Sequence, residues 1–466
     1  MDDASNSGAF APLSGDFPAA AREDWEALAA KALKGAPLST LQRRGFDGLI
    51  VQPLYTRSDA ARSLAPMRRE TWDIRVGIPS TADAPSLALE ALAGGASSLL
   101  VEAHDGGEML ERTLADVLLD VAPVALDAGF AGPAAARALS AVAKASPAAP
   151  LAFHLDPLSA LARAGASPGP IANHLSLAAR TAAALSQTHP GASLFLASGL
   201  SVHEAGGSPA QELAFALACA LAYAKALTAA GRPSPQTWAG IVVELAAEAQ
   251  PLTAIPKLRA ARALWKRVTE ACGAATPLRL QVRSSGRMLT RADPATNLVR
   301  LTAAGFSAVI GGAGAIILDP FDGAVSESPS PLARRQSRNI QLILAEESGL
   351  VGADDPAAGA WALEALADET ARAAWSEFQA IERLGGATAA LVSGHVARNA
   401  EAARDELRER LENRSLRLVG VTDFTAADAP AGATPPSPRV AREGARLDGP
   451  DTLCEFLAPL RLEDLA

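Results

Sequence analysis

Residues 72–103 read WDIRVGIPSTADAPSLALEALAGGASSLLVEA, and this stretch contains the pattern that decides the fold. Two short apolar runs, at 72–78 and 97–103, flank a segment of helical composition at 85–95. A strand, a helix and a second strand in this order predict parallel strands joined by a crossover helix, because parallel neighbours cannot be joined by a tight turn.

The same alternation continues along the chain. Further apolar runs, most of them followed by a helical segment, lie at 121–127, 151–156, 192–198, 240–246, 278–284 and 307–312. Eight such strand–helix units, spread over roughly 250 residues, predict an α/β fold of the (β/α)8 TIM-barrel type. A doubly wound open sheet is the alternative, but no G-x-G-x-x-G sequence follows the first strand to favour it.

The segments around this pattern differ from it in composition. An amphipathic helix near Asp24–Leu33 is too small to form a core of its own, and Ser208, Pro209 and Gln211 are typical of a capped helix start. The predicted organisation is an N-terminal arm at 1–50, a TIM barrel at 51–350, a helical extension at 351–424, and a Pro/Ala-rich linker and tail at 425–466.

Composition restricts the possible function classes. Hydrophobic residues make up 49% of the chain but aromatic residues only 4%, which predicts a core of Ala, Leu and Val. The net charge of −9, with both signs scattered, argues against a nucleic-acid surface. The start of the chain lacks the apolar segment of a signal peptide, and the Ala-rich segments are interrupted by charged or polar residues, so we expect no membrane association. Cys219, Cys272 and Cys454 are too few for a disulfide framework and favour a cytoplasmic location.

Motifs in five stretches of the chain occur in an order that resembles one protein family. They are PLYT at 53–56, WDIR at 72–75, KLRAARALW at 257–265, a Ser-Ser-Gly…Leu-Thr…Asp-Pro…Asn…Val-Arg pattern at 284–302, and RNIQLILAEE at 338–347. Together they resemble the substrate-binding barrel of the cobalamin-dependent acyl-CoA mutases, the methylmalonyl-CoA mutase family. The resemblance covers about residues 45–420.

This resemblance gives a meaning to SGLSVHEAGG at 198–207. Catalytic members carry S-G-Y-H-M-Q-E-A-G at this junction, with the Tyr-His pair against the substrate thioester. Aligned without gaps, Leu200 replaces the tyrosine, Ser201 replaces the histidine, and His203 takes the place of the glutamine. The resemblance therefore implies no catalytic residues here. An alternative is that His203 shifts by two positions and acts in place of the missing histidine.

Other family features are also missing. After the fourth strand the family has Q-N-D and an arginine loop that pairs with the acyl carboxylate, whereas here His154 replaces the glutamine and only Asp156 matches. His104, in EAHDGG at 102–107, resembles the cobalt-binding D-x-H-x-x-G motif, but it lies at the end of a predicted barrel strand. We therefore expect no flavodoxin-like cobalamin domain and no cofactor or metal bound by this chain.

The resemblance implies a small (beta), non-catalytic subunit in a heterodimer with a large (alpha) subunit of methylmalonyl-CoA mutase that holds adenosylcobalamin. The complex would interconvert methylmalonyl-CoA and succinyl-CoA. One alternative is a catalytic acyl-CoA mutase barrel whose cobalamin domain is a separate chain. Another is an unrelated barrel enzyme that uses polar residues at strand ends, with the candidates Glu102, Asp127, Asp156, Glu244 and Arg283.

Overall fold

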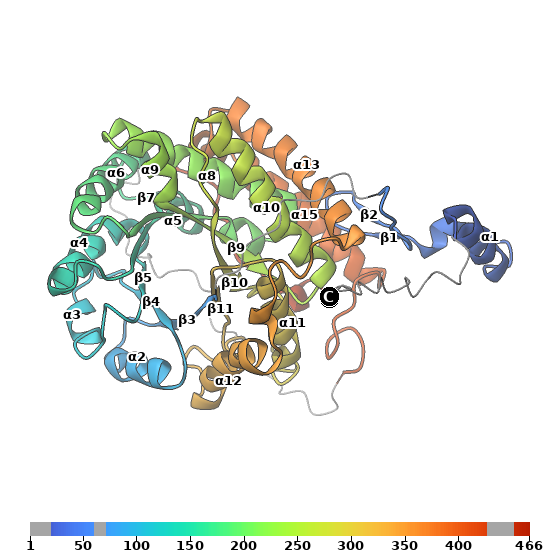
Figure 1. The fold of residues 1–466 in the computed structure, drawn as a ribbon, viewed down its shortest axis with the longest axis horizontal. Helices are drawn as coiled ribbons and strands as arrows, with labels where there is room; N and C mark the ends of the chain where they lie inside the picture. Colours follow the sequence, from blue (N-terminus) through green and yellow to red (C-terminus); the bar gives the residue numbers. More distant parts are fainter. Residues whose placement is uncertain (1–19, 60–70, 426–451) are drawn as a thin grey trace, which may run out of the picture.

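A computed structural model describes residues 20–59, 71–425 and 452–466 of the chain. Its centre is a closed barrel of parallel strands in the order β3-β4-β5-β6-β8-β9-β10-β11, with β11 pairing back to β3 (Figure 1). The predicted TIM barrel is thus confirmed. The strands are β3 (Asp73–Ile78), β4 (Ser98–Glu102), β5 (Val124–Asp127), β6 (Leu151–Leu155), β8 (Ser193–Ser198), β9 (Ile241–Ala247), β10 (Arg279–Ser284) and β11 (Ala315–Ile317).

The eighth strand does not lie where the sequence predicts it. Residues 307–312 were expected to form it, but helix α11 (Asn297–Ile310) continues through most of them. Leu301, Ala304 and Ala308 are fully buried at helical spacing, so the apolar run is the end of a helix face. The strand is β11, which begins only after the glycines that follow the helix.

The crossover helices cover the outside of the barrel. In α8 the predicted capping box is confirmed, because the Ser208 hydroxyl accepts from Gln211 N and the Gln211 side chain accepts from Ser208 N. By length and composition α8 could cross a membrane, contrary to expectation, but 67% of its apolar window is buried inside the protein. The helices are α2 (Ala84–Ala93), α3 (Leu110–Thr113), α4 (Gly132–Val142), α5 (Pro157–Ala164), α6 (Ile171–Thr188), α7 (Leu200–Glu204), α8 (Pro209–Ala229), α9 (Ser234–Ala239), α10 (Pro251–Ala271), α11 and α12 (Pro331–Leu342).

A helical extension packs against one side of the barrel. It consists of α13 (Trp361–Arg383), α14 (Ala387–Val392) and α15 (His395–Glu412), and α13 lies along α8 and α10 (Figure 1). A buried ion pair between Arg259 of α10 and Asp355 holds the segment that precedes α13 against α10. The extension therefore covers the crossover helices that follow β8 and β9.

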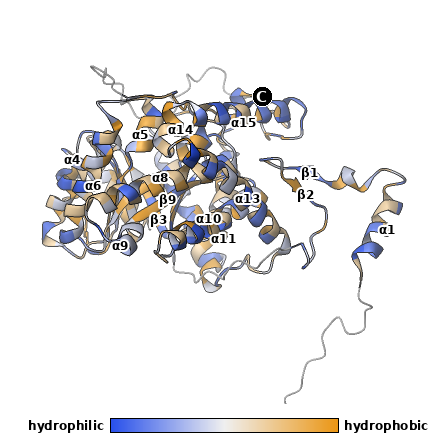
Figure 2. Cartoon of the chain, turned by 90° about the horizontal axis from the view of Figure 1, so that it is seen from above, coloured by the Kyte–Doolittle hydropathy of each residue, from blue (hydrophilic) through white to orange (hydrophobic). Residues whose placement is uncertain are grey.

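The two parts of the N-terminal arm behave differently. Helix α1 (Arg22–Ala32) has no buried residue and stands apart from the barrel (Figures 1 and 2). The hairpin of β1 (Arg43–Arg44) and β2 (Ile50–Val51) is docked, because the Asp47 carboxylate accepts from Ser208 Oγ and Ala210 N at the start of α8. Burial raises the pKa of Asp47, against these two hydrogen bonds.

Candidate functional site

The segment 198–207 joins β8 to α8 at the carboxyl end of the barrel, where active sites of this fold lie. Ser198 ends the strand, and its hydroxyl donates to Glu244 Oε2 at 2.7 Å. Gly199 lies so close to α8 that an added Cβ would be 2.5 Å from Glu212 O. Helix α7 begins directly after this contact, with Gly199 as its N-cap.

His203 faces the helix layer and is only 1% exposed. Its Nε2 is 2.8 Å from Ser285 Oγ, and its Nδ1 is 3.3 Å from Glu212 Oε2. The Glu248 carboxylate lies 3.4 Å from Nε2. Both ring nitrogens thus have partners within the protein, and neither is available to a ligand in this arrangement.

These contacts belong to a fully buried group of charges, the His203 cluster, which consists of His203, Glu212, Glu248, Lys257 and Arg287. Lys257 Nζ is 2.5 Å from Glu212 Oε2, and Arg287 Nη2 is 2.5 Å from Glu248 Oε1. Burial alone would raise the pKa of Glu212, but the charges of Lys257 and His203 outweigh it and lower this pKa to about 2. The cluster is therefore internally compensated, as buried charges must be.

The sequence did not predict this cluster. Lys257 belongs to the KLRAARALW motif and Arg287 follows the Ser-Ser-Gly motif, but nothing in either motif indicates a buried partner. Glu212, in the first turn of α8, has the pattern of an ordinary acidic residue at a helix start. The only local indication of the cluster is Lys257, a lysine that lies among the buried residues of α10.

Leu200 and Ser201 begin helix α7, at the positions where the motif resemblance predicts that the tyrosine and histidine are replaced. Leu200 is half-buried and has no polar group to offer. Ser201 is 7% exposed, and its hydroxyl has no hydrogen-bond partner among the residues that the structure describes. A hydroxyl without a partner to orient or polarise it is a weak substitute for an imidazole as a donor to a thioester carbonyl.

His154 lies on β6 and Asp156 directly after the strand, and the two have different surroundings. His154 is buried with a left-handed φ of 46°, and neither ring nitrogen has a hydrogen-bond partner within the described parts of the chain. Burial, followed by the charge of Arg75, lowers its pKa well below the usual value. Asp156 caps α5 by accepting from Ser159 N at 3.2 Å, and it also accepts from the Tyr223 hydroxyl. Burial raises its pKa to about 6.

The interior of the barrel contains a continuous hydrogen-bonded chain. Arg75 of β3 donates to Gln281 Oε1, and Gln281 Nε2 donates to Glu244 Oε1 at 2.7 Å. Glu244 in turn accepts from Ser198. All four side chains are at most 7% exposed, so they fill the space between β3, β10, β9 and β8.

Glu102, Asp127 and Arg283, three of the strand-end candidates, lie close enough to influence one another. Burial and the charge of Asp127 raise the pKa of Glu102. For Asp127 burial acts in the same direction, but Arg163 and other cations outweigh it and lower the pKa. Arg283 forms an ion pair with Asp319 at 3.4 Å. Glu244 and Asp156 are instead tied into the interior chain and the α5 cap.

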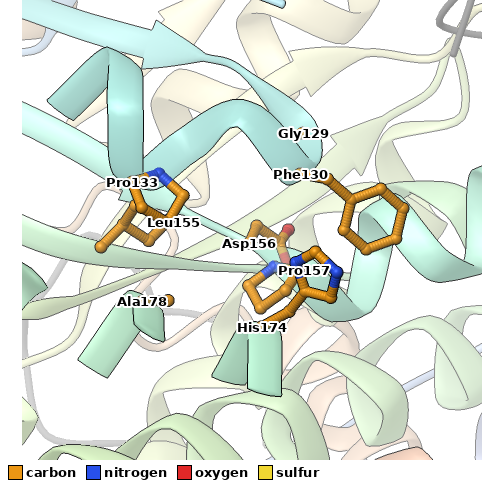
Figure 3. Close-up of a pocket in the computed structure, with 8 residues that line it drawn as sticks. All are labelled: Gly129, Phe130, Pro133, Leu155, Asp156, Pro157, His174 and Ala178. Atoms are coloured by element: carbon orange, nitrogen blue, oxygen red, sulfur yellow. The ribbon is translucent and has the colours of Figure 1, made fainter. Parts of the chain in front are cut away.

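Two small pockets in the described part of the chain have no room for a substrate. One lies among α4, α5 and α6 and leaves about 10 Å³, room for about one water (Figure 3). The other leaves about 30 Å³ between the hairpin and α13. Pockets for small molecules are typically several hundred Å³. Within the described residues no three His, Cys, Asp or Glu side chains are placed to hold a metal ion.

Fold and site together define an α/β-barrel protein whose interior and strand-end junctions are held by its own polar side chains. Residues 102–444 match the family model described as methylmalonyl-CoA mutase. The chain is 37% identical, over 93% of its length and 76% of the relative, to the methylmalonyl-CoA mutase small subunit of Streptomyces virginiae. It is 32% identical to that of Propionibacterium freudenreichii subsp. shermanii, over 93% of the chain and 73% of the relative. The chain belongs to the methylmalonyl-CoA mutase family.

A third comparison concerns a relative whose name does not mention a small subunit. The methylmalonyl-CoA mutase of Escherichia coli is 32% identical, but over only 49% of this chain and 32% of the relative. The similarity to small subunits thus extends much further along the chain. The family resemblance predicted from the five motifs is confirmed.

Proposed function

We propose that this chain is the small, non-catalytic subunit of a cytoplasmic, heterodimeric methylmalonyl-CoA mutase. The proposal rests on which residues occupy the junction after β8. Leu200 and Ser201 stand where catalytic relatives place tyrosine and histidine, while Gly199 keeps its close contact with α8. The scaffold of the junction is retained without the groups that would hold a thioester.

The surroundings of this junction support the same conclusion. His203, two positions after Ser201, is engaged by Ser285, Glu212 and Glu248. To act on a ligand it would have to leave these contacts, which would remove one partner each from Ser285, Glu212 and Glu248. Removing a hydrogen-bond partner from a buried polar group typically costs about 1–3 kcal/mol.

In this proposal adenosylcobalamin is held by the large subunit. When bound there, adenosylcobalamin would supply radical chemistry to the complex. The residues of this chain do not fit it: His104 is exposed in the turn after β4, and His154 is buried inside the barrel. Neither residue stands in a group of metal-ligating side chains in the part of the chain that the structure describes.

The large subunit also gives helix α1 a partner. Leu28 is 69% exposed, and no residue of this helix is buried. An isolated helix of 11 residues is marginal in water, because too few hydrogen bonds offset its nucleation. We propose that α1 packs on the large subunit. The hairpin, bonded through Asp47 to the start of α8, attaches the following part of the arm to the barrel.

Reconstitution tests the proposal. The tagged chain should co-purify with a second barrel protein that carries a cobalamin domain, and this complex should convert methylmalonyl-CoA to succinyl-CoA with adenosylcobalamin. Ser201→Ala in this chain should leave the turnover number of the complex unchanged, whereas substitution of the matching histidine in the large subunit should abolish turnover. Turnover by this chain with only a separate cobalamin-domain protein would instead establish the alternative of a catalytic barrel.

A further inference from the structure

Residues 452–466, here called the strap, lie across the carboxyl end of the barrel. The strap begins as β12 (Thr452–Leu453), which pairs antiparallel with β7 (Ala166–Ser167) just after α5. Two further backbone bonds continue this contact, from Cys454 N to Gly165 O at 2.9 Å and from Leu457 N to Ala162 O at 3.0 Å. Over the two paired residues the strap binds as in the β-addition by which proteins commonly hold extended peptides.

The strap then reaches the segments that follow β8 and β10. Leu460 N donates to Glu204 O at 2.8 Å, and Leu462 N donates to Arg287 O at 2.8 Å. The Glu463 carboxylate accepts from Arg291 N at 2.9 Å. The segments after three barrel strands, β6, β8 and β10, are thereby connected through one short length of chain.

Two leucines anchor the strap. Leu457 is 4% exposed and joins the main core, while Leu462 is 6% exposed. Leu462 packs into a second apolar cluster that also contains Phe46 of the hairpin. Figure 2 shows the end of the chain beside α15, which contributes Leu407 and Leu411 to the same cluster.

The surface under the strap is shaped to receive it. Gly206 has a φ of 102°, and an added Cβ would be 3.0 Å from Leu460 Cδ2 and 2.8 Å from Arg404 Cβ. At Gly165, with a φ of 73°, an added Cβ would be 3.2 Å from Phe456 Cβ. Glycine at both positions therefore provides the backbone conformation and the space that the strap needs.

We infer that these segments form a binding site for a linear peptide, occupied by the strap of the same chain. The recognition chemistry is an extended backbone for β7, two leucine anchors, and a carboxylate for the amides at 291 and 292. Binding of the strap holds the segments after β6, β8 and β10 in their observed places. The inference is independent of the proposed function.

Hydrogen exchange of the full chain, read by mass spectrometry, tests the inference. Leu457→Ala and Leu462→Ala should each speed exchange of the amides in 162–167, 204–207 and 286–291 by about tenfold or more, because local opening becomes easier. Leu453→Ala is the matched control, since this leucine is 58% exposed and only its backbone is used. If either buried-leucine variant does not fold, Glu463→Gln replaces it, with faster exchange expected at 291–292.

A peptide experiment separates a bound segment from an ordinary part of the core. A synthetic peptide of residues 452–466, added in excess to the Leu457→Ala/Leu462→Ala chain, should restore slow exchange in the three segments. The same peptide with both leucines replaced by alanine should not. Unchanged exchange in the single variants, equally faster exchange throughout the barrel, or no rescue by the peptide would each overturn the inference.

Discussion

At the scale of single residues, the junction after β8 contains residues with structural contacts beside a residue whose polar group makes none within the described residues. Gly199 and Glu204 keep structural contacts, the first with α8 and the second with Gly286 N at 2.8 Å. His203 is part of the buried charge cluster, whereas the Ser201 hydroxyl has no partner within the described residues. The contacts of His203, which could replace the missing histidine according to the sequence, are therefore with the protein itself.

We expect the two residues to differ sharply in their effect on stability. His203→Ala should lower the free energy of unfolding by about 3 kcal/mol, because it removes a central member of the cluster and leaves Ser285 and two carboxylates without this partner. Ser201→Ala should change it by less than about 1 kcal/mol, since no hydrogen bond is lost. Urea unfolding at pH 7 measures both values. A costly Ser201→Ala would show that its hydroxyl has a structural role.

The raised pKa of Asp156 predicts a pH-dependent effect. A folded pKa of about 6 against 3.8 means that the stability from the protonated form is present below pH 3.8 and is lost as the pH rises through about 6. The Asp156→Asn amide oxygen can still accept from Tyr223 and Ser159 N. The variant should therefore be about 3 kcal/mol more stable than the wild type at pH 8. Urea unfolding at pH 8 and pH 4 should show this advantage shrinking to near zero at pH 4.

The sequence located the junction but could not show its internal contacts. Gly199 and Glu204 fix the register of the motif, which places the substitutions at Leu200 and Ser201 without a structure. Glu212 and Lys257 are far apart in the sequence, and only the packing of α8 on α10 brings them together. The function of His203 depends on such pairs, so composition and spacing left its role open.

At the scale of elements, the alternation of strands and helices predicted the barrel because each unit is local. The error at 307–312 arose where the local signal was ambiguous: a short apolar run ending in glycines is compatible with a strand or with the last turn of a helix. The true strand, β11, has only three residues and is identified by its pairing with β10 and β3.

Contact between α8 and the junction gives a prediction at this scale. In Gly199→Ala the new Cβ would be 2.5 Å from the backbone oxygen of Glu212, which cannot move without shifting α8. We expect a loss of about 1–3 kcal/mol in the free energy of unfolding. Gly191→Ala is the control, because nothing lies within 4 Å of its added Cβ. Equal stability of the two variants in urea would contradict this close packing.

At the scale of the whole molecule, the N-terminal hairpin and the strap contribute to one apolar cluster. Phe46 comes from the N-terminal hairpin and Leu462 from the strap, and both pack on leucines of α15. The sequence predicted an arm and a tail but not their meeting, since contacts between distant ends leave no periodic signal in either segment. Helix α1 is the part of the described arm that stays outside this packing.

The difference between α1 and the hairpin is testable by deletion. Removing residues 1–36 takes away α1 but spares the hairpin, so thermal stability of the chain alone should be unchanged. Assembly with the proposed large subunit, measured by size-exclusion chromatography, should fall. Phe46→Ala should behave in the opposite way and lower the free energy of unfolding by about 3 kcal/mol, because this ring is buried. Full assembly of the deletion variant would rule out α1 as a contact with the large subunit.

Isothermal titration of the purified chain with methylmalonyl-CoA and adenosylcobalamin, together with an assay for succinyl-CoA, tests most directly whether a mutase barrel has kept its shape and lost its chemistry. We expect no saturable binding of either compound at micromolar concentrations and no succinyl-CoA from the chain alone. Stoichiometric binding of both compounds, with turnover that His203→Gln abolishes in a still-folded chain, would contradict that claim.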